Sequence, residues 1–347
     1  MAGEKKFRVA LIGTDSLRGK EIRNILSSKK FPLSHIEFFD PDVKEEYSKL
    51  TDFRGEPRVI QHPSAAALEG LDLVFLAGDR KTSLTFGRLA GEKTYSALDL
   101  TGAFSDQEDF PLIVAGVNDS ILEAKPAYLI VNPHPVTIIL SSLLHRLISK
   151  FGLAKAVAFV LQPVSAFDES GIEELASQSA AMLSGESSTR EVFRDQIAFN
   201  VLSHTEAPDA NGFSSAERQV IAEIKRVLGE PGLPLSLSII QAPVFHTYSI
   251  MAYVEPATET NIKDLERIYR ASPLFKIAAP SSSCSVTCLS VAGKDEIFIG
   301  QIKKEASFPN AFWIWTVTDN LTRGSALNAL EIARAVYDRK PGEPGSK

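Results

Sequence analysis

The sequence YLIVNPHPVTIILSSLLHRLISK, residues 128–150, joins a predicted strand to a predicted helix through a short turn. Residues 128–131 suit a buried strand, residues 132–137 form the turn, and residues 139–148 repeat apolar side chains at helical spacing. The first turn of such a helix offers unpaired N–H groups and the positive end of the helix dipole, which suit a thiolate or an oxyanion. A nucleophile would stand at position 135, and that position holds a proline.

The length of 347 residues and the 44% hydrophobic content predict two domains, each with its own core. The 37 Lys and Arg and the 43 Asp and Glu residues give a net charge of −6 without a basic cluster, which argues against nucleic acid and an anionic membrane surface. No apolar run approaches the roughly 20 residues that a bilayer requires. With no apolar signal region at residues 1–6, the cytoplasm is the expected compartment.

The chain has two cysteines, Cys284 and Cys288, four positions apart and without a cluster of histidines or further cysteines nearby. This usage argues against a disulfide framework and against a metal site. A buried, unreactive thiol is the prediction for each.

Residues 7–12 form a predicted inner strand, followed by the loop GTDSLRG at 13–19 and a helix from residue 20. A strand, a glycine-bearing turn and a helix are the context of a dinucleotide fingerprint, which makes Gly13, Thr14, Ser16 and Leu17 candidate cofactor positions. The middle glycine of the loop is replaced by Ser16, which hinders the approach of a pyrophosphate. A plain strand–helix turn capped by Ser16 explains the same residues.

The next predicted strands, 36–39 and 73–77, end at Asp40 and Gly78, which complete the candidate cofactor positions in this half. An acid at position 40 would hydrogen-bond a ribose 2′-hydroxyl and repel a 2′-phosphate, so NAD is favoured over NADP if any cofactor binds. The alternative is that Asp-Pro-Asp at 40–42 is simply good turn chemistry. Strands at 95–100, 111–114 and 128–131 alternate with helical patterns and predict a parallel, doubly wound Rossmann-type sheet.

The pattern changes after residue 150. Long strand candidates at 156–166, 237–256, 285–291, 296–302 and 312–318, with few helices between them, predict an α+β domain with a mixed or antiparallel sheet. The segment FWIW at 312–315 is apolar on both faces, which favours a dimer interface, although a fully buried strand would look the same. The predicted domains are residues 1–133 plus 319–340 and residues 134–318, with a disordered tail at 341–347.

Short motifs in a fixed order resemble one family across nearly the whole chain, that of aspartate-semialdehyde dehydrogenase. These motifs are the 13–19 loop, DLTGAF at 99–104, PLIV at 111–114, VN at 117–118, NP at 132–133, LQPVS at 161–165, FNV at 199–201, APV at 242–244, and Asp319-Asn320 through Gly324 to Asn328-Ala329. The resemblance implies a cysteine thiolate that attacks a carbonyl, a histidine that moves protons, NADP, and cationic side chains that bind phosphate and carboxylate.

Most of these functional positions are replaced in this chain. The cysteine falls on Pro135, the histidine on Tyr248, two arginines on Ser105 and Gln241, and a glutamate and a lysine on Ala216 and Gln219. The resemblance implies a loop under the nicotinamide, which reads SAFD at 165–168 in this chain. It also makes Asn320 a candidate cofactor-binding position. Gln162 is the one polar active-site residue that matches the family pattern.

Together these replacements predict that the family's reaction is lost, since removing one member of a nucleophile–base unit already costs several orders of magnitude. Within this family the sequence resembles the bacterial paralogues that carry QAPVF, here at 241–245, and lack the cysteine. The first hypothesis is a non-catalytic homodimer that binds a small molecule or a partner protein. The second is an NAD-dependent oxidoreductase that uses Tyr248 or His246 as its acid–base group, because both would share one face of a strand. Retention of the full dehydrogenase activity ranks last.

Overall fold

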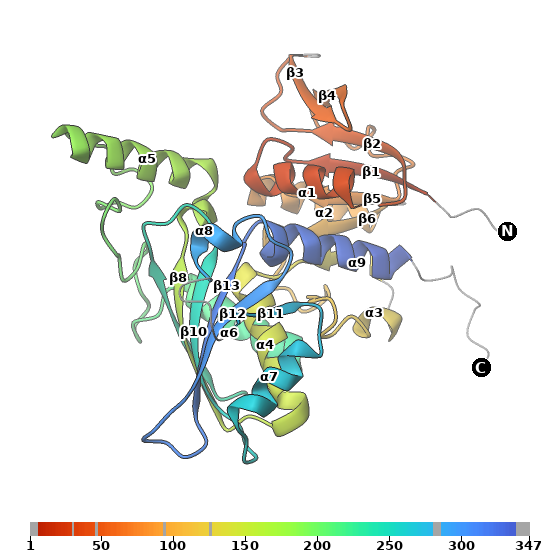
Figure 1. The fold of residues 1–347 in the computed structure, drawn as a ribbon. Helices are drawn as coiled ribbons and strands as arrows, with labels where there is room; N and C mark the ends of the chain where they lie inside the picture. Colours follow the sequence, from red (N-terminus) through yellow and green to blue (C-terminus); the bar gives the residue numbers. More distant parts are fainter. Residues whose placement is uncertain are drawn as a thin grey trace, which may run out of the picture. The chain divides into compact units, whose positions relative to one another are not determined.

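Figure 1 shows the chain in a computed structural model, which describes residues 6–29, 31–45, 48–92, 95–124, 127–279 and 286–337. The chain divides into unit 1, residues 1–134 and 325–347, and unit 2, residues 135–324. Residues 319–324, which the sequence assigned to the first domain, belong to unit 2. The physical reason is that the Asp319 carboxylate accepts the N–H of Gly293 at 2.8 Å, inside unit 2. The predicted tail at 341–347 lies outside the described residues.

Unit 1 is built on a sheet of seven strands in the order β3-β4-β2-β1-β5-β6-β7. Neighbouring strands run parallel, except for the antiparallel pair β3 and β4. The predicted parallel, doubly wound sheet is therefore confirmed. The strands are β1 (Phe7–Ile12), β2 (Leu33–Phe39), β3 (Lys49–Phe53), β4 (Glu56–Gln61), β5 (Leu73–Leu76), β6 (Ser96–Asp99) and β7 (Leu129–Val131).

Two details of this sheet differ from the prediction. The β3–β4 hairpin was not predicted, because its strands expose most of their side chains and carry little apolar signal. The strand predicted at 111–114 is wrong, since that segment contributes only the single bridge between Leu112 and Val131.

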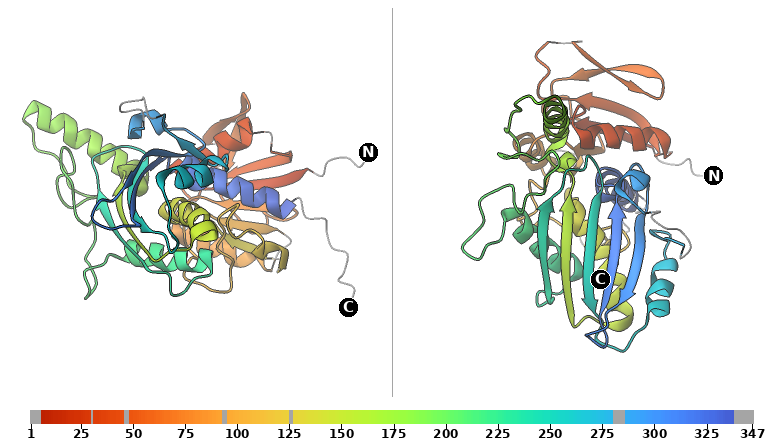
Figure 2. Two further views of the ribbon diagram at one scale, coloured as in Figure 1. Left: turned by 60° about the horizontal axis from the view of Figure 1, so that its bottom comes forward. Right: turned by 60° about the vertical axis from the view of Figure 1, so that its left-hand side comes forward.

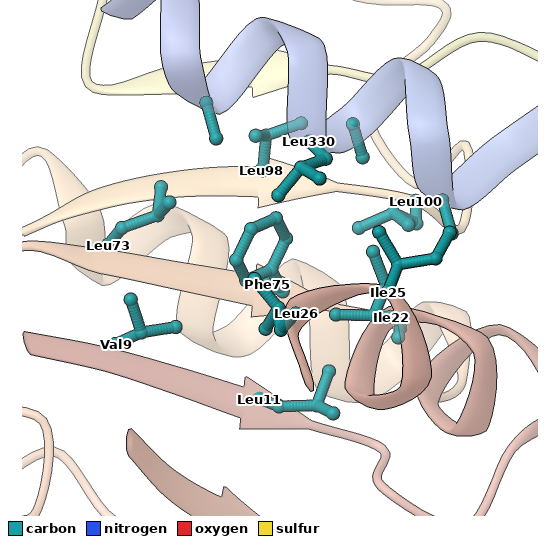
Figure 3. Packing of buried hydrophobic residues seen from close by; sticks show 14 of the residues in the cluster. Val9, Leu11, Ile22, Ile25, Leu26, Leu73, Phe75, Leu98, Leu100 and Leu330 are labelled. Atoms are coloured by element: carbon teal, nitrogen blue, oxygen red, sulfur yellow. The ribbon is translucent and has the colours of Figure 1, made fainter. Parts of the chain in front are cut away.

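Helices cover both faces of this sheet, and all four residues of β5 are buried. The helices of unit 1 are α1 (Leu17–Ser28), α2 (Arg80–Ala90), α3 (Ile121–Ala124) and α9 (Leu327–Tyr337). Figure 3 shows the core that α1 and α9 share with the strands. In it, Phe75 of β5 lies between Leu26 of α1 and Leu330 of α9. This packing fixes the carboxyl ends of the strands and the start of α1, where a ligand of such a fold binds.

Unit 2 contains a mixed sheet of six strands in the order β11-β12-β13-β10-β8-β9. The central strands pair antiparallel, while β8 with β9 and β11 with β12 pair parallel. The predicted mixed-sheet domain is confirmed. The strands are β8 (Lys155–Gln162), β9 (Leu235–Gln241), β10 (Tyr248–Glu255), β11 (Phe275–Ile277), β12 (Ile297–Lys304) and β13 (Phe312–Thr318).

One face of this sheet is covered by α4 (Pro135–Phe151), α6 (Ser215–Leu228) and α7 (Ile262–Arg270), whose apolar side chains form one core with the strands. The opposite face carries rows of large apolar side chains. Phe159, Met251 and Trp315 are cross-strand neighbours on β8, β10 and β13. The right-hand view of Figure 2 shows this face with α4 and α6 behind the strands. We call it the open face.

The remaining elements of unit 2 are short or lie outside the sheet. They are a 3₁₀ turn at Val164–Phe167, α5 (Asp168–Ser184), α8 (Cys288–Val291) and a π-helical turn at Thr322–Ala326. The strand predicted at 285–291 is wrong, because Thr287 caps α8 in a capping box with Ser290. No helix in the described part of the chain is long and apolar enough to cross a membrane. Within the same residues, no group of His, Cys, Asp and Glu side chains is arranged to hold a metal ion.

Candidate functional site

Position 135 is the first residue of α4, whereas the sequence placed residues 132–137 in a turn and predicted the helix from residue 139, so the helix begins earlier than predicted. Proline suits the first helical position because its missing N–H would have no intrahelical partner there. The ring is half-buried and lies against Gly324, since a Cβ added to that glycine would lie 3.1 Å from the Cβ of Pro135. Pro135 therefore brings neither a nucleophilic atom nor a hydrogen-bond donor to the start of the helix.

Three polar side chains form a buried network at the ends of three strands. The Tyr248 hydroxyl donates to Oε1 of Gln162 at 3.1 Å, and Nε2 of Gln162 donates to Oε1 of Gln241 at 3.1 Å. Nε2 of Gln241 in turn donates to the carbonyl of Gln162 at 3.0 Å and to that of Ala242 at 3.1 Å. None of the three side chains carries a charge. The two glutamine amides do not ionise, and burial raises the pKa of Tyr248 above its usual range.

Strand register explains why these distant residues meet. Gln162 ends β8 and Gln241 ends β9, and the two are direct partners in the parallel β8–β9 pair. Tyr248 begins β10, which runs antiparallel to β8, so its first residue lies at the same end of the sheet. Side chains alternate along each strand, and these three belong to the face that α4 and α6 cover. The structure thus brings together three positions that the sequence assigned to one site.

Gln219 is directed toward a carboxylate. Its Nε2 donates to Oε1 of Glu223 at 2.8 Å, one turn further along α6. The other oxygen of this buried carboxylate accepts from the Thr137 hydroxyl at 2.6 Å, in the first turn of α4. Position 219 therefore holds a neutral amide that is hydrogen-bonded to Glu223 within unit 2.

A second buried network holds Asn320. Its Oδ1 accepts the N–H of Thr247 at 3.0 Å, and its Nδ2 donates to the Ser165 hydroxyl at 3.1 Å. Thr247 has φ of +76°, which is unusual for a β-branched residue. Its hydroxyl is buried without a hydrogen-bond partner among the described residues.

The proposed pairing of His246 with Tyr248 on one strand face is wrong. β10 begins at Tyr248, so His246 lies in the preceding loop. The left-handed backbone at Thr247 also breaks the alternation of side chains that a continuous strand would have.

In unit 1, the 13–19 loop joins β1 to α1. Ser16 is the N-cap of α1, and its hydroxyl accepts the N–H of Gly19 at 2.9 Å. Leu17 is the first helical residue, and the Thr14 hydroxyl donates to the carbonyl of Phe39 at 3.0 Å. Asp40 follows β2, and Gly78 lies directly after Ala77, which hydrogen-bonds to β1. The predicted cofactor positions Gly13, Thr14, Ser16, Leu17, Asp40 and Gly78 all lie at this end of the sheet.

Arg18 was not singled out by the sequence analysis. Its Nη2 donates to the carbonyl of Gly78 at 3.2 Å. An arginine in the first turn of a helix opposes the helix dipole, and that signal was available in the sequence. The imidazole of His134 is affected by this arginine. Burial of His134 and, to a lesser degree, the positive charge of Arg18 lower the pKa of His134 to about 4, so the imidazole is neutral at physiological pH.

Two other predicted positions have local roles in the described structure. The Ser105 hydroxyl donates to the carbonyl of Gly102 at 3.0 Å, within a turn of unit 1. Cys288 is half-buried on α8, with its Sγ 3.3 Å from the Ser249 hydroxyl, so a fully buried thiol is the wrong prediction there. Cys284 lies outside the described residues.

Two family models match the chain. Residues 8–124 match the one described as "Semialdehyde dehydrogenase, NAD binding domain", and residues 144–323 match "Semialdehyde dehydrogenase, dimerisation domain". The chain is 28% identical over 331 residues to the aspartate-semialdehyde dehydrogenase of Rickettsia bellii, covering 95% of this chain and 97% of that protein. It is also 28% identical over 339 residues to the enzyme of that name from Rickettsia conorii, covering 96% and 98%.

Solved structures share the fold over nearly the whole chain. A probable aspartate-semialdehyde dehydrogenase from Pseudomonas aeruginosa superposes with a TM-score of 0.89 at 26% identity, covering 95% of this chain and 98% of that one. Aspartate semialdehyde dehydrogenase II from Vibrio cholerae, complexed with ASA, superposes with a TM-score of 0.90 at 23% identity, covering 96% and 98%. The second similarity concerns the fold alone.

Proposed function

This chain belongs to the semialdehyde dehydrogenase family, and from that premise we propose that it lacks the family's dehydrogenase activity and binds a ligand or a partner protein as a dimer. The proposal rests mainly on the buried, uncharged network of Tyr248, Gln162 and Gln241. The resemblance assigns a histidine and an arginine to the positions of Tyr248 and Gln241. Here the proton carrier and the cation are replaced by a phenol and an amide that hydrogen-bond to the same glutamine.

The nucleophilic step has no candidate atom at the position where the resemblance puts the thiolate. Pro135 has no thiol, hydroxyl or N–H, and Gly324 packs directly against its ring. A neighbouring hydroxyl, that of Thr137, donates to the Glu223 carboxylate and is committed to that contact. A covalent acyl intermediate at the start of α4 is therefore not expected.

Proton transfer also lacks a suitable group. A general acid or base works best with a pKa near the operating pH. Burial raises the pKa of Tyr248 far from that range, and its hydroxyl proton is engaged by Gln162. This observation also argues against the second hypothesis, an altered NAD-dependent chemistry that uses Tyr248.

The resemblance implies cationic side chains that bind phosphate and carboxylate, so an acyl phosphate bound at the replaced positions would bury negative charge without cations. Gln241 and Gln219 present neutral amides that are already hydrogen-bonded, and Ser105 presents a hydroxyl that binds its own turn. Burying an ion without a compensating charge is costly. The expected ligand of this chain therefore differs from an acyl phosphate.

The dimer part of the proposal rests on the open face of unit 2. Phe159 is 45% exposed, and with the half-buried Met251 and Trp315 it forms an apolar row across three strands. Apolar surface that stays partly exposed on a sheet face is typical of interaction surfaces. The match of residues 144–323 to a dimerisation-domain model supports a second copy of the chain as the partner.

The direct test is an assay with aspartate semialdehyde, phosphate and NADP, in which NADPH formation by the purified chain is followed. We expect no turnover above that of the matched variant P135A, which removes only the ring at the nucleophile position. P135C should also remain inactive, because Tyr248, Gln241 and Gln219 are unchanged in it. Turnover by the unmodified protein that exceeds P135A and scales with protein concentration would refute the proposal.

A further inference from the structure

We propose that the 13–19 loop of unit 1 excludes a nicotinamide dinucleotide, because Ser16 and Arg18 bridge the place where its pyrophosphate would lie. The family model matched by this unit is described as NAD-binding. The residues of this chain do not fit that ligand. This inference rests on the proposed function, which is the loss of dehydrogenase activity, and adds that the cofactor of that reaction is not bound either.

The glycines of the loop divide by their roles. In a dinucleotide fingerprint, the first glycine makes the turn, the second lets the pyrophosphate approach, and the third allows helix and strand to pack closely. Gly13 has φ of +88°, and a Cβ on it would lie 2.2 Å from the Cα of Gly78. A Cβ on Gly19 would lie 2.0 Å from the carbonyl oxygen of Gly13. These close contacts require glycine at positions 13 and 19, and the middle position of this G-x-x-G-x-x-G-like loop holds Ser16.

The side chain at position 16 is held by backbone contacts. The Ser16 hydroxyl lies 2.7 Å from the carbonyl of Ala77 and 2.9 Å from that of Gly13, and it accepts the N–H of Gly19. A phosphate at a helix N-terminus is bound by such N–H groups. In this chain the serine hydroxyl takes the N–H of Gly19, so a phosphate would have to displace it.

Arg18 forms a second bridge next to the first. The strand order places β1 between β2 and β5, so the carboxyl ends of β1 and β5 flank the point where the chain reverses direction across the sheet. Ligands of doubly wound sheets bind at that point. Arg18 Nη2 reaches across it from α1 to the carbonyl of Gly78, directly after the residue that Ser16 contacts.

The acid expected to bind the ribose is also engaged. The carboxylate of Asp40 accepts the N–H of Asp15 at 3.3 Å and the N–H of Asp42 at 3.1 Å, and the residue is 5% exposed. Lys49 of β3 pairs with the Asp15 carboxylate at 2.8 Å and so ties the loop to the neighbouring hairpin. A ribose diol would compete with the turn that Asp40 stabilises.

Unit 2 gives an independent observation of the same kind. Asn320, a candidate cofactor position, uses its carboxamide oxygen for Thr247 and its amide group for Ser165. All three residues are buried. The amide is thus committed within unit 2 instead of being available to a cofactor.

The experiment is calorimetric titration of the full chain with NAD and with NADP, each to millimolar concentration, for the unmodified protein and the variants S16G, R18A and S16G/R18A. We expect no saturable heat from the unmodified protein. We expect S16G/R18A to bind NAD at least roughly tenfold more tightly than the unmodified chain, a difference of about 1.4 kcal/mol. The matched control is R23A/S28G, which removes an arginine and a serine from the same helix, away from its N-terminus.

Thermal unfolding of each variant shows that it is folded, and the single variant R18A keeps the Ser16 cap if S16G unfolds. Micromolar binding by the unmodified chain would overturn the proposal. If the unmodified chain binds measurably, weaker binding in R18A would make Arg18 a ligand of the phosphate and would likewise overturn it. Failure of both the unmodified chain and the folded S16G/R18A variant to bind would also overturn the blocking role of these side chains. The titration measures cofactor binding and the dehydrogenase assay measures turnover. The inference about the loop can therefore fail without the proposed loss of activity failing, and the reverse also holds.

Discussion

The hydroxyl of Tyr248 lies 3.1 Å from Oε1 of Gln162 and donates to it in the interior of unit 2. Tyr248 is 1% exposed, so water does not replace this partner if it is lost. The contact converts a position that the family resemblance assigns to a proton carrier into part of a structural network. Its energetic role can be measured directly.

Y248F is expected to destabilise the chain by about 1–2 kcal/mol, because it keeps the ring and leaves a buried amide oxygen without its donor. Urea unfolding followed by tryptophan fluorescence measures the change. Y253F is the matched control on the same strand, since the Tyr253 hydroxyl donates to the partly exposed carboxylate of Glu255. Y253F should therefore cost less. Equal losses in the two variants would argue against a special role for the buried contact.

Thr247 has a left-handed backbone directly before Tyr248, the position to which the family resemblance assigns the histidine. Its φ is +76°, its side chain is buried, and its hydroxyl has no partner among the described residues. A left-handed conformation costs residues with a Cβ about 1–2 kcal/mol, whereas glycine adopts it freely. T247G is expected to be more stable than T247A by about 1 kcal/mol, measured as the difference in free energy of unfolding. A T247A protein as stable as T247G would show that the backbone relaxes there.

His134 is expected to make stability depend on pH. Burial and, to a lesser degree, Arg18 lower the pKa of this imidazole in the folded chain to about 4, below roughly 6.5 in the unfolded chain. Between these values the unfolded state binds the proton preferentially, so stability falls as pH falls from 6.5 toward 4. The loss is at most about 3 kcal/mol, because the residue keeps some solvent exposure.

The measurement compares the free energy of unfolding at about pH 7 and at about pH 5 in the unmodified chain and in H134Q. H134Q should lose less stability on acidification. H204Q, at an exposed position, controls for the removal of a histidine. If H134Q and the unmodified chain respond to pH in the same way, the burial of His134 is not linked to folding.

The open face of unit 2 predicts the effect of a charge placed on it. F159E introduces a carboxylate into the apolar row with Met251 and Trp315. The unmodified chain is expected to have twice the monomer mass of 37.8 kDa by light scattering, and F159E is expected to have the monomer mass. L50E alters an apolar side chain that is 63% exposed on β3 of unit 1 and should stay dimeric. A dimeric F159E would place the interface elsewhere.

The sequence by itself determined the class of fold and the family. Alternating strand and helix signals at 7–131 predicted the parallel sheet of unit 1, because buried strands and amphipathic helices have different apolar periods. The order of short motifs predicted the family, and the sequence has a proline at position 135. These features depend on residue identity and local spacing, which a sequence contains in full.

The tertiary structure alone decided what the remaining polar residues do. Gln162, Gln241 and Tyr248 meet because β8, β9 and β10 align in one register, and that register is set by pairing between segments far apart in the chain. The links from Ser16 to Ala77 and from Arg18 to Gly78 likewise join residues about 60 positions apart. Whether a polar side chain faces a ligand or another part of its own chain depends on such long-range neighbours, and no local pattern encodes them.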